Sequence, residues 1–175
     1  MAVAIAALLL APLGGCVPSP EAQPTQSPIP HATPLFSSDK EALAAATKAY
    51  AAYLKVSDEI AHDGGAHPER IKAVATGEAL KDALRGFAEY RDSKAHSVGA
   101  RHFDHVRIQA VDAMTVTFYV CDDVSDVEVL DESGKSLVSS DRPSRSAFVV
   151  SASGAKNAEV MISSRDKWEG KNECN

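Results

Sequence analysis

The chain has 175 residues and a formal net charge of −6, from 24 acidic and 18 basic side chains. Because the basic residues form no stripe, nucleic acid is excluded as the expected partner, and an anionic lipid surface would repel the chain. The length suits one folded domain, since most single domains comprise about 100 to 150 residues.

An apolar run over residues 2–13 opens the sequence. It has about the length of a signal-peptide core and is too short to span a bilayer. Two glycines and Cys16 follow, and residues 13–16 read LGGC, which resembles a bacterial lipobox. We therefore predict a lipoprotein signal peptide over residues 1–15 and lipidation of Cys16, with a buried apolar segment as the alternative. No Lys or Arg precedes the run, so we expect translation to start upstream of Met1.

A proline-rich stretch follows the cysteine. Residues 17–35 contain six of the nine prolines and a single charged side chain, that of Glu21. Such a composition cannot bury enough apolar surface to fold, so residues 16–36 are predicted to be the lipidated cysteine and an extended tether. The expected location is the outer face of the cell membrane, with the lipid as the attachment.

The next part of the chain favours helices. Over residues 37–65, apolar side chains recur at spacings of three and four, Ser37 or Ser38 can cap the first turn, and two glycines end the pattern. Two shorter helices are predicted over residues 67–75 and 76–95.

From Ser97 onward the apolar period changes to two, which is typical of antiparallel strands. The predicted strand segments are residues 100–112, 114–123, 126–138, 145–153 and 157–168, with turns at residues 112–113, 132–134 and 153–155. The predicted helices all precede the predicted strands, and this order predicts one α+β domain over residues 37–175.

This order resembles the nuclear transport factor 2-like fold, in which a curved antiparallel sheet wraps around three N-terminal helices to form a cone. Residues 120–135, VCDDVSDVEVLDESGK, and the closing Trp168, Gly170 and Cys174 resemble small actinobacterial lipoproteins with this cone. The resemblance implies the cone fold and an extracytoplasmic location, and it implies no assigned catalytic residues. The acidic side chains of residues 121–132 are expected to be solvated.

The chain has three cysteines, an odd number for an exported protein. If Cys16 carries lipid, Cys121 and Cys174 remain and can form a disulfide, which persists outside the cytoplasm. Two free buried thiols are the alternative. Two lone cysteines with no neighbouring ligand pair do not predict a metal site, and no metal or cofactor is expected.

The densest group of chemically active side chains is RHFDH, residues 101–105. In a regular strand His102 and Asp104 share one face with Val106 and Ile108, whereas His105 points the other way. A histidine oriented by an aspartate can act as a general base.

Asp112 and Tyr119 complete this candidate catalytic set; the alternative is a group of solvated polar side chains at the mouth of the sheet. We favour a non-enzymatic binding module, whose partner is a cell-envelope protein or a small apolar ligand. An isomerase, dehydratase or hydrolase that uses His102 and Asp104 is the second hypothesis. It requires the four candidate side chains to converge in one cavity.

Overall fold

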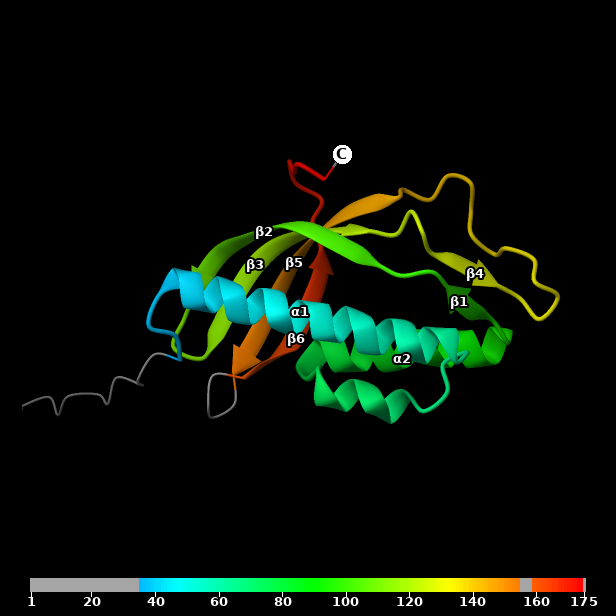
Figure 1. Ribbon diagram of the computed structural model, residues 1–175, viewed down its shortest axis with the longest axis horizontal. Helices are drawn as coiled ribbons and strands as arrows, with labels where there is room; N and C mark the ends of the chain where they lie inside the picture. The colour runs from blue at the N-terminus through cyan, green and yellow to red at the C-terminus, as the bar shows by residue number, and fades with distance from the viewer. Residues whose placement is uncertain (1–34, 155–158, 175) are drawn as a thin grey trace, which may run out of the picture. The chain divides into compact units, whose positions relative to one another are not determined.

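The computed structural model describes residues 35–154 and 159–174, all within the unit Ala32–Asn175. Within these residues, three helices precede six strands and pack against antiparallel sheets, which confirms the predicted α+β class (Figure 1). The predicted signal peptide and lipidation site, and all but the last two residues of the predicted tether, lie outside the described residues. Those two residues, Leu35 and Phe36, pack against the hydrophobic core.

Helix α1 (Asp39–His62) begins and ends where its capping residues predict. Ser38 is the N-cap, and its hydroxyl accepts a hydrogen bond from the backbone N–H of Glu41. At the other end the N–H of Gly65 donates to the carbonyl of Ile60 at 2.8 Å, which closes the last turn.

The short 3-10 helix η1 (Pro68–Ala73) and helix α2 (Gly77–Ser93) follow. Gly65 adopts a left-handed φ of 77°, and a Cβ placed on it would lie 2.2 Å from the carbonyl oxygen of Phe87 in α2. A glycine is therefore required where the end of α1 meets α2. None of the helices in the described part of the chain is long and apolar enough to cross a membrane.

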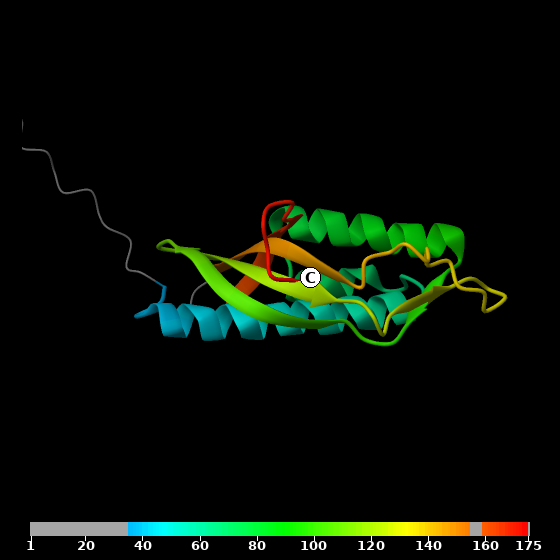
Figure 2. The same ribbon diagram turned by 90° about the horizontal axis from the view of Figure 1, so that it is seen from above.

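The main sheet is an antiparallel meander of four strands. Strands β2 (His102–Val111), β3 (Thr115–Asp123), β5 (Arg145–Gly154) and β6 (Val160–Lys167) lie in that order. Helices α1 and α2 pack along one face of this sheet, and the C-terminal residues cross the other (Figures 1 and 2).

Strands β1 (His96–Val98) and β4 (Glu128–Leu130) pair with each other in a separate two-stranded ribbon. Of the predicted strand segment 126–138, only residues 128–130 form a strand, β4. The predicted turn at residues 132–134 is confirmed, since the N–H of Gly134 donates to the carbonyl of Asp131 at 3.0 Å. The carboxylate of Asp131 accepts hydrogen bonds from the backbone N–H groups of Ser133 and Lys135, at 2.8 and 3.0 Å, and so starts a turn at once.

Strand β2 contains a β-bulge that changes which of its residues face the helices. Asp104 is paired with Cys121 and Arg107 with Tyr119, so His105 and Val106 together lie opposite the single residue between those partners. His105 has a left-handed φ of 53°.

The side chains of Phe103, Val106 and Ile108 pack against the core, whereas His102 and Asp104 are exposed. The prediction that His102 and Asp104 share a face with Val106 and Ile108 is therefore wrong. The extra residue of the bulge reverses the alternation partway along the strand.

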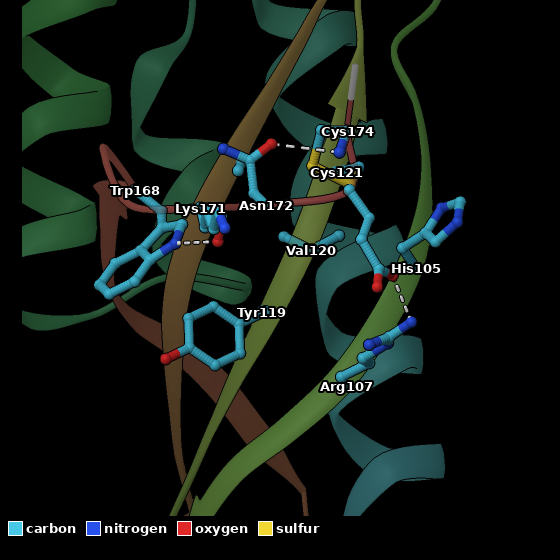
Figure 3. A pocket seen from close by; sticks show the side chains of 11 residues that line it. His105, Arg107, Tyr119, Val120, Cys121, Trp168, Lys171, Asn172 and Cys174 are labelled. Carbon is cyan, nitrogen blue, oxygen red and sulfur yellow. Dashed lines mark hydrogen bonds and ion pairs between the residues drawn. A yellow bond between two sulfur atoms is a disulfide. The ribbon is translucent and has the colours of Figure 1, made fainter.

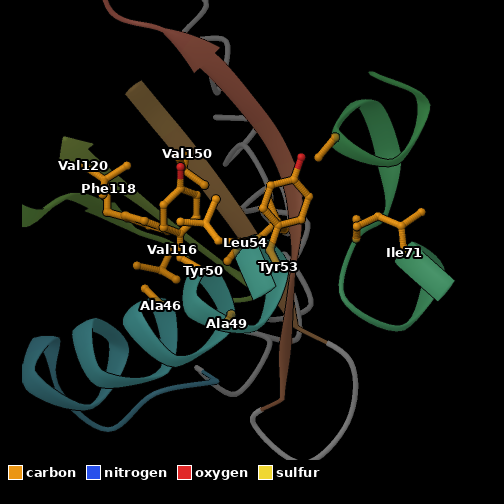
Figure 4. Packing of buried hydrophobic residues seen from close by; sticks show 14 of the residues in the cluster. Ala46, Ala49, Tyr50, Tyr53, Leu54, Ile71, Val116, Phe118, Val120 and Val150 are labelled. Atoms are coloured by element: carbon orange, nitrogen blue, oxygen red, sulfur yellow. The ribbon is translucent and has the colours of Figure 1, made fainter. Parts of the chain in front are cut away.

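The hydrophobic core lies between α1 and the sheet (Figure 4). A group of hydrogen-bonded polar side chains lies beside it. The hydroxyl of Tyr50 donates to a carboxylate oxygen of Asp122 at 2.6 Å, and Arg165 donates to that hydroxyl at 2.9 Å and to the other oxygen of Asp122. The guanidinium carbon of Arg165 lies 3.4 Å from the centre of the Phe148 ring.

Asp122 is only 2% exposed, which makes the expectation of a fully solvated acidic run wrong at this position. A buried carboxylate is tolerated here because it has a cation and a hydroxyl as partners. Burial is also the main reason that the pKa of the Tyr50 hydroxyl lies well above its ordinary value.

Candidate functional site

The C-terminal segment, residues 168–174, closes a pocket of about 320 Å³ on the sheet face opposite the helices (Figure 3). We call it the C-terminal pocket. It is lined by His105, Arg107, Tyr119, Val120, Cys121, Ala147, Trp168, Lys171, Asn172, Glu173 and Cys174. Its size suits a small organic molecule.

A disulfide joins Cys121 in β3 to Cys174, with the two Cα atoms 5.3 Å apart. This confirms the predicted pairing and excludes the alternative of two free thiols. Both cysteines are buried and pack with Ala147 of β5. The bond fixes the C-terminal segment to the middle of the sheet.

Arg145, at the start of β5, is the second attachment of this segment. Its Nε donates to the carbonyl oxygen of Cys174 at 3.0 Å. Its two Nη atoms donate to Asp123 at 2.9 Å and to Asp104 at 2.6 Å. One side chain therefore joins the C-terminal segment to β2 and β3.

These contacts shift the acidity of both carboxyl groups. Hydrogen bonds from Ser125, and then the bond from Arg145, lower the pKa of Asp123 to about 2. The hydrogen bond with His105 and the bond from Arg145 lower the pKa of Asp104. Both carboxylates are thus stabilised in their charged form.

Trp168 and Tyr119 form one wall of the pocket. Their rings meet edge to face, with centres 5.4 Å apart. The backbone N–H of Trp168 donates to the carbonyl of Ala147 at 2.9 Å, and its indole N–H donates to the carbonyl of Lys171 at 3.2 Å. Trp168 is therefore held through both its backbone and its indole N–H.

The opposite wall is polar and comes from the bulged part of β2. Arg107 donates through Nη2 to the carboxylate of Glu173, and His105 lies beside this pair (Figure 3). Including Lys171, the lining has three basic side chains and one acidic side chain.

The four predicted catalytic candidates do not converge in one cavity. Tyr119 lines the C-terminal pocket, whereas His102 is exposed and lies 3.5 Å from Asp126. Asp112 is exposed at the turn between β2 and β3. Asp104 lies 2.7 Å from the Nδ1 atom of His105, so it orients His105 and not His102.

Asp104, His105 and Cys121 are the one group of metal-binding side chain types that lies within 4.8 Å among the described residues. The sulfur of Cys121 is bonded to that of Cys174, so it is not a thiolate ligand. The two remaining groups do not make a closed metal site.

A second cavity, of about 300 Å³, lies between α1, α2 and the β1–β4 ribbon. Its charged groups are already paired within the chain. Asp58 accepts from Nε of Arg101 at 2.6 Å, and Arg142 donates to the carbonyls of Val124 and Val127. In the C-terminal pocket, by contrast, Lys171 has no carboxylate partner among residues 35–154 and 159–174, which makes this pocket the better candidate for ligand binding.

Two solved structures are similar in fold to this chain. The intermembrane-space region of the chloroplast protein ARC6 superposes with a TM-score of 0.53 and 10% identity, over 71% of this chain and 95% of that chain. Aln2 from a Streptomyces species gives a TM-score of 0.44 and 19% identity, over 74% of this chain and 91% of that chain. No protein-family model matches the chain, and neither does any curated protein.

Sequence reasoning missed Arg107, Arg145, Trp168 and Glu173 as members of the site. The signal that could have found them is the disulfide itself. Once Cys174 is placed on β3, the residues just before it must lie across neighbouring strands.

Proposed function

We propose that the chain is a lipoprotein held at the outer face of the cell membrane by lipid on Cys16. The disulfide between Cys121 and Cys174 supports this, because such bonds persist in oxidising, extracytoplasmic compartments and are rare in the cytosol. The lipobox-like residues 13–16 and the proline-rich tether support it independently.

The domain is proposed to be a binding module with the nuclear transport factor 2-like cone fold. Two helices along one face of an antiparallel meander support the cone. The observation that carries the binding role is the C-terminal pocket, in which an aromatic wall and an apolar floor are held rigid by a disulfide and Arg145. A small ligand with an apolar part is the preferred partner, and a cell-envelope protein is the other.

Replacement of Cys16 by serine tests the anchor. The Cys16→Ser variant should lose incorporation of labelled palmitate, keep its first 15 residues and wash off membranes in salt. Ser19→Ala, in the same tether, is the matched control and should behave like the unmodified chain. A Cys16→Ser variant that is still processed and still stays with washed membranes contradicts the proposal.

One observation favours a second candidate function. Asp104 and His105 form a carboxylate–imidazole pair at 2.7 Å on the rim of the C-terminal pocket, which is the arrangement of a general base. In that case a His105→Gln variant would fold normally and lose a cellular function that His102→Gln retains. Equal phenotypes of the two variants favour the binding module.

A further inference from the structure

We propose that the C-terminal pocket binds a small organic carboxylate with an aromatic or apolar body, and that Glu173 occupies the carboxylate position until the ligand displaces it. The proposal deepens the binding role given above and depends on it. It does not depend on the membrane anchor.

The aromatic wall and the apolar floor define the body of the ligand. Trp168 and Tyr119, whose rings pack edge to face, line the pocket together with Ala147 and the disulfide. A flat apolar group of the size of a benzene ring fits a cavity of about 320 Å³ and gains contact with both rings.

The charges of the lining define the other end of the ligand. The two cations Arg107 and Lys171 outnumber the one acid, Glu173, and Lys171 has no carboxylate partner among residues 35–154 and 159–174. An anion is therefore favoured over a neutral or cationic ligand. A guanidinium group binds a carboxylate best through two parallel hydrogen bonds.

Glu173 shows where that carboxylate lies. It accepts from only one nitrogen of Arg107, so the remaining donors of the guanidinium make no side-chain or backbone hydrogen bond within the described part of the chain. The side chains of Arg107 and Glu173 are both 63% exposed, and exposed ion pairs contribute little to stability. A ligand that can make two hydrogen bonds can therefore replace Glu173.

The walls require little reorganisation when the ligand binds. The disulfide, the bond from Arg145 to the Cys174 carbonyl and the two hydrogen bonds of Trp168 already hold the C-terminal segment over the sheet. Affinity is lost mainly when a binding surface must be ordered, and here only the Glu173 side chain has to move.

Trp168 is the single tryptophan of the chain, so its fluorescence reports on this pocket alone. Titration of the full chain with phenylacetate should give a saturable change in fluorescence. Phenylacetamide, which has the same body without the charge, should bind about tenfold more weakly, because one charge-assisted hydrogen bond is lost. No saturable change with phenylacetate, or equal affinity for the two compounds, overturns the proposal.

Two variants separate the roles of the ion pair. Arg107→Gln should remove the preference for phenylacetate over the amide, and Glu173→Gln should bind phenylacetate about two- to fivefold more tightly, because the internal competitor is gone. Arg85→Gln is the matched control, since Arg85 is a similarly exposed arginine paired with Asp82 on α2. Circular dichroism checks that each variant is folded.

A retained preference in Arg107→Gln, or unchanged binding in Glu173→Gln, contradicts the proposed arrangement. Failure of this titration leaves the anchor untouched, because fractionation of Cys16→Ser measures the anchor separately. Conversely, a chain that is not processed or does not stay with membranes, but still binds phenylacetate more tightly than phenylacetamide, refutes the lipoprotein proposal and leaves the pocket proposal intact.

Discussion

Replacement of Asp122 by asparagine removes the negative charge of the polar group formed by Tyr50, Asp122 and Arg165. Asp122 is 2% exposed and accepts hydrogen bonds from Tyr50 and Arg165. The amide has almost the same shape, so the change isolates the charge. The asparagine has one acceptor oxygen in place of two, so it can accept from Arg165 or from Tyr50 but not from both, and the positive charge of Arg165 loses its negative partner.

Breaking a fully buried ion pair from one side typically costs about 3 to 5 kcal/mol. The Arg165 side chain is 22% exposed, so water can compensate in part, and we expect a loss near the lower end, about 3 kcal/mol. Urea unfolding followed by circular dichroism measures this loss: the urea concentration at the midpoint should fall, and the dependence of the unfolding free energy on urea concentration should stay the same.

The exposed Asp126 provides the control, since Asp126→Asn should change stability by less than about 0.5 kcal/mol. The double variant Asp122→Asn with Arg165→Gln should lose less stability than the two single variants lose together. We expect the difference, which is the coupling free energy, to exceed about 1 kcal/mol. A loss below about 1 kcal/mol in Asp122→Asn, or strict additivity, would refute a net contribution from the buried charge pair.

Three more outcomes follow from the structure. Cys174→Ser opens a disulfide with a sequence separation of 53 residues, which corresponds to up to about 4 kcal/mol and about 10 °C in Tm; calorimetry that shows no change contradicts it. The lowered pKa values of Asp104 and Asp123 mean that their stabilising effect is complete above the ordinary value of 3.8; it is lost as pH falls toward about 2 for Asp123, and as pH falls through the lowered pKa for Asp104. Tryptophan fluorescence should therefore change in this window, and a flat acid titration argues against it. Gly65→Ala should destabilise by more than about 1 kcal/mol in thermal unfolding, whereas Gly86→Ala, where a Cβ meets nothing within 4 Å, should not; equal melting points would contradict the backbone argument.

Local signals were enough to predict most of the elements. Helix α1 was located by the cap at Ser38 and by the glycines after residue 63, because both act within one turn of the chain. The core strands β3 and β5 were located by apolar alternation for the same reason. Strand β1 was missed because three residues carry too little pattern.

Long-range contacts account for what the sequence did not predict. The burial of Asp122 depends on Tyr50, 72 residues away, and on Arg165, 43 residues away. A left-handed conformation is uncommon for any residue other than glycine, and histidine adopts it in only a minority of cases, so no local rule places a bulge at His105. The pocket was missed for a similar reason, since its walls come from β2, β3, β5 and the C-terminal segment.

The bulge at His105 also restricts how the length of the chain can vary. If one residue were deleted there, Phe103 would turn away from Tyr50, whose ring centre lies 5.2 Å from its own, and Asp104 would turn toward the core. Insertions and deletions in relatives should therefore fall in the segment between β4 and β5, and an alignment that places a gap inside β2 would exchange its buried and exposed positions. An aligned relative that lacks the bulge should instead show its apolar residues displaced by one position over residues 102–104.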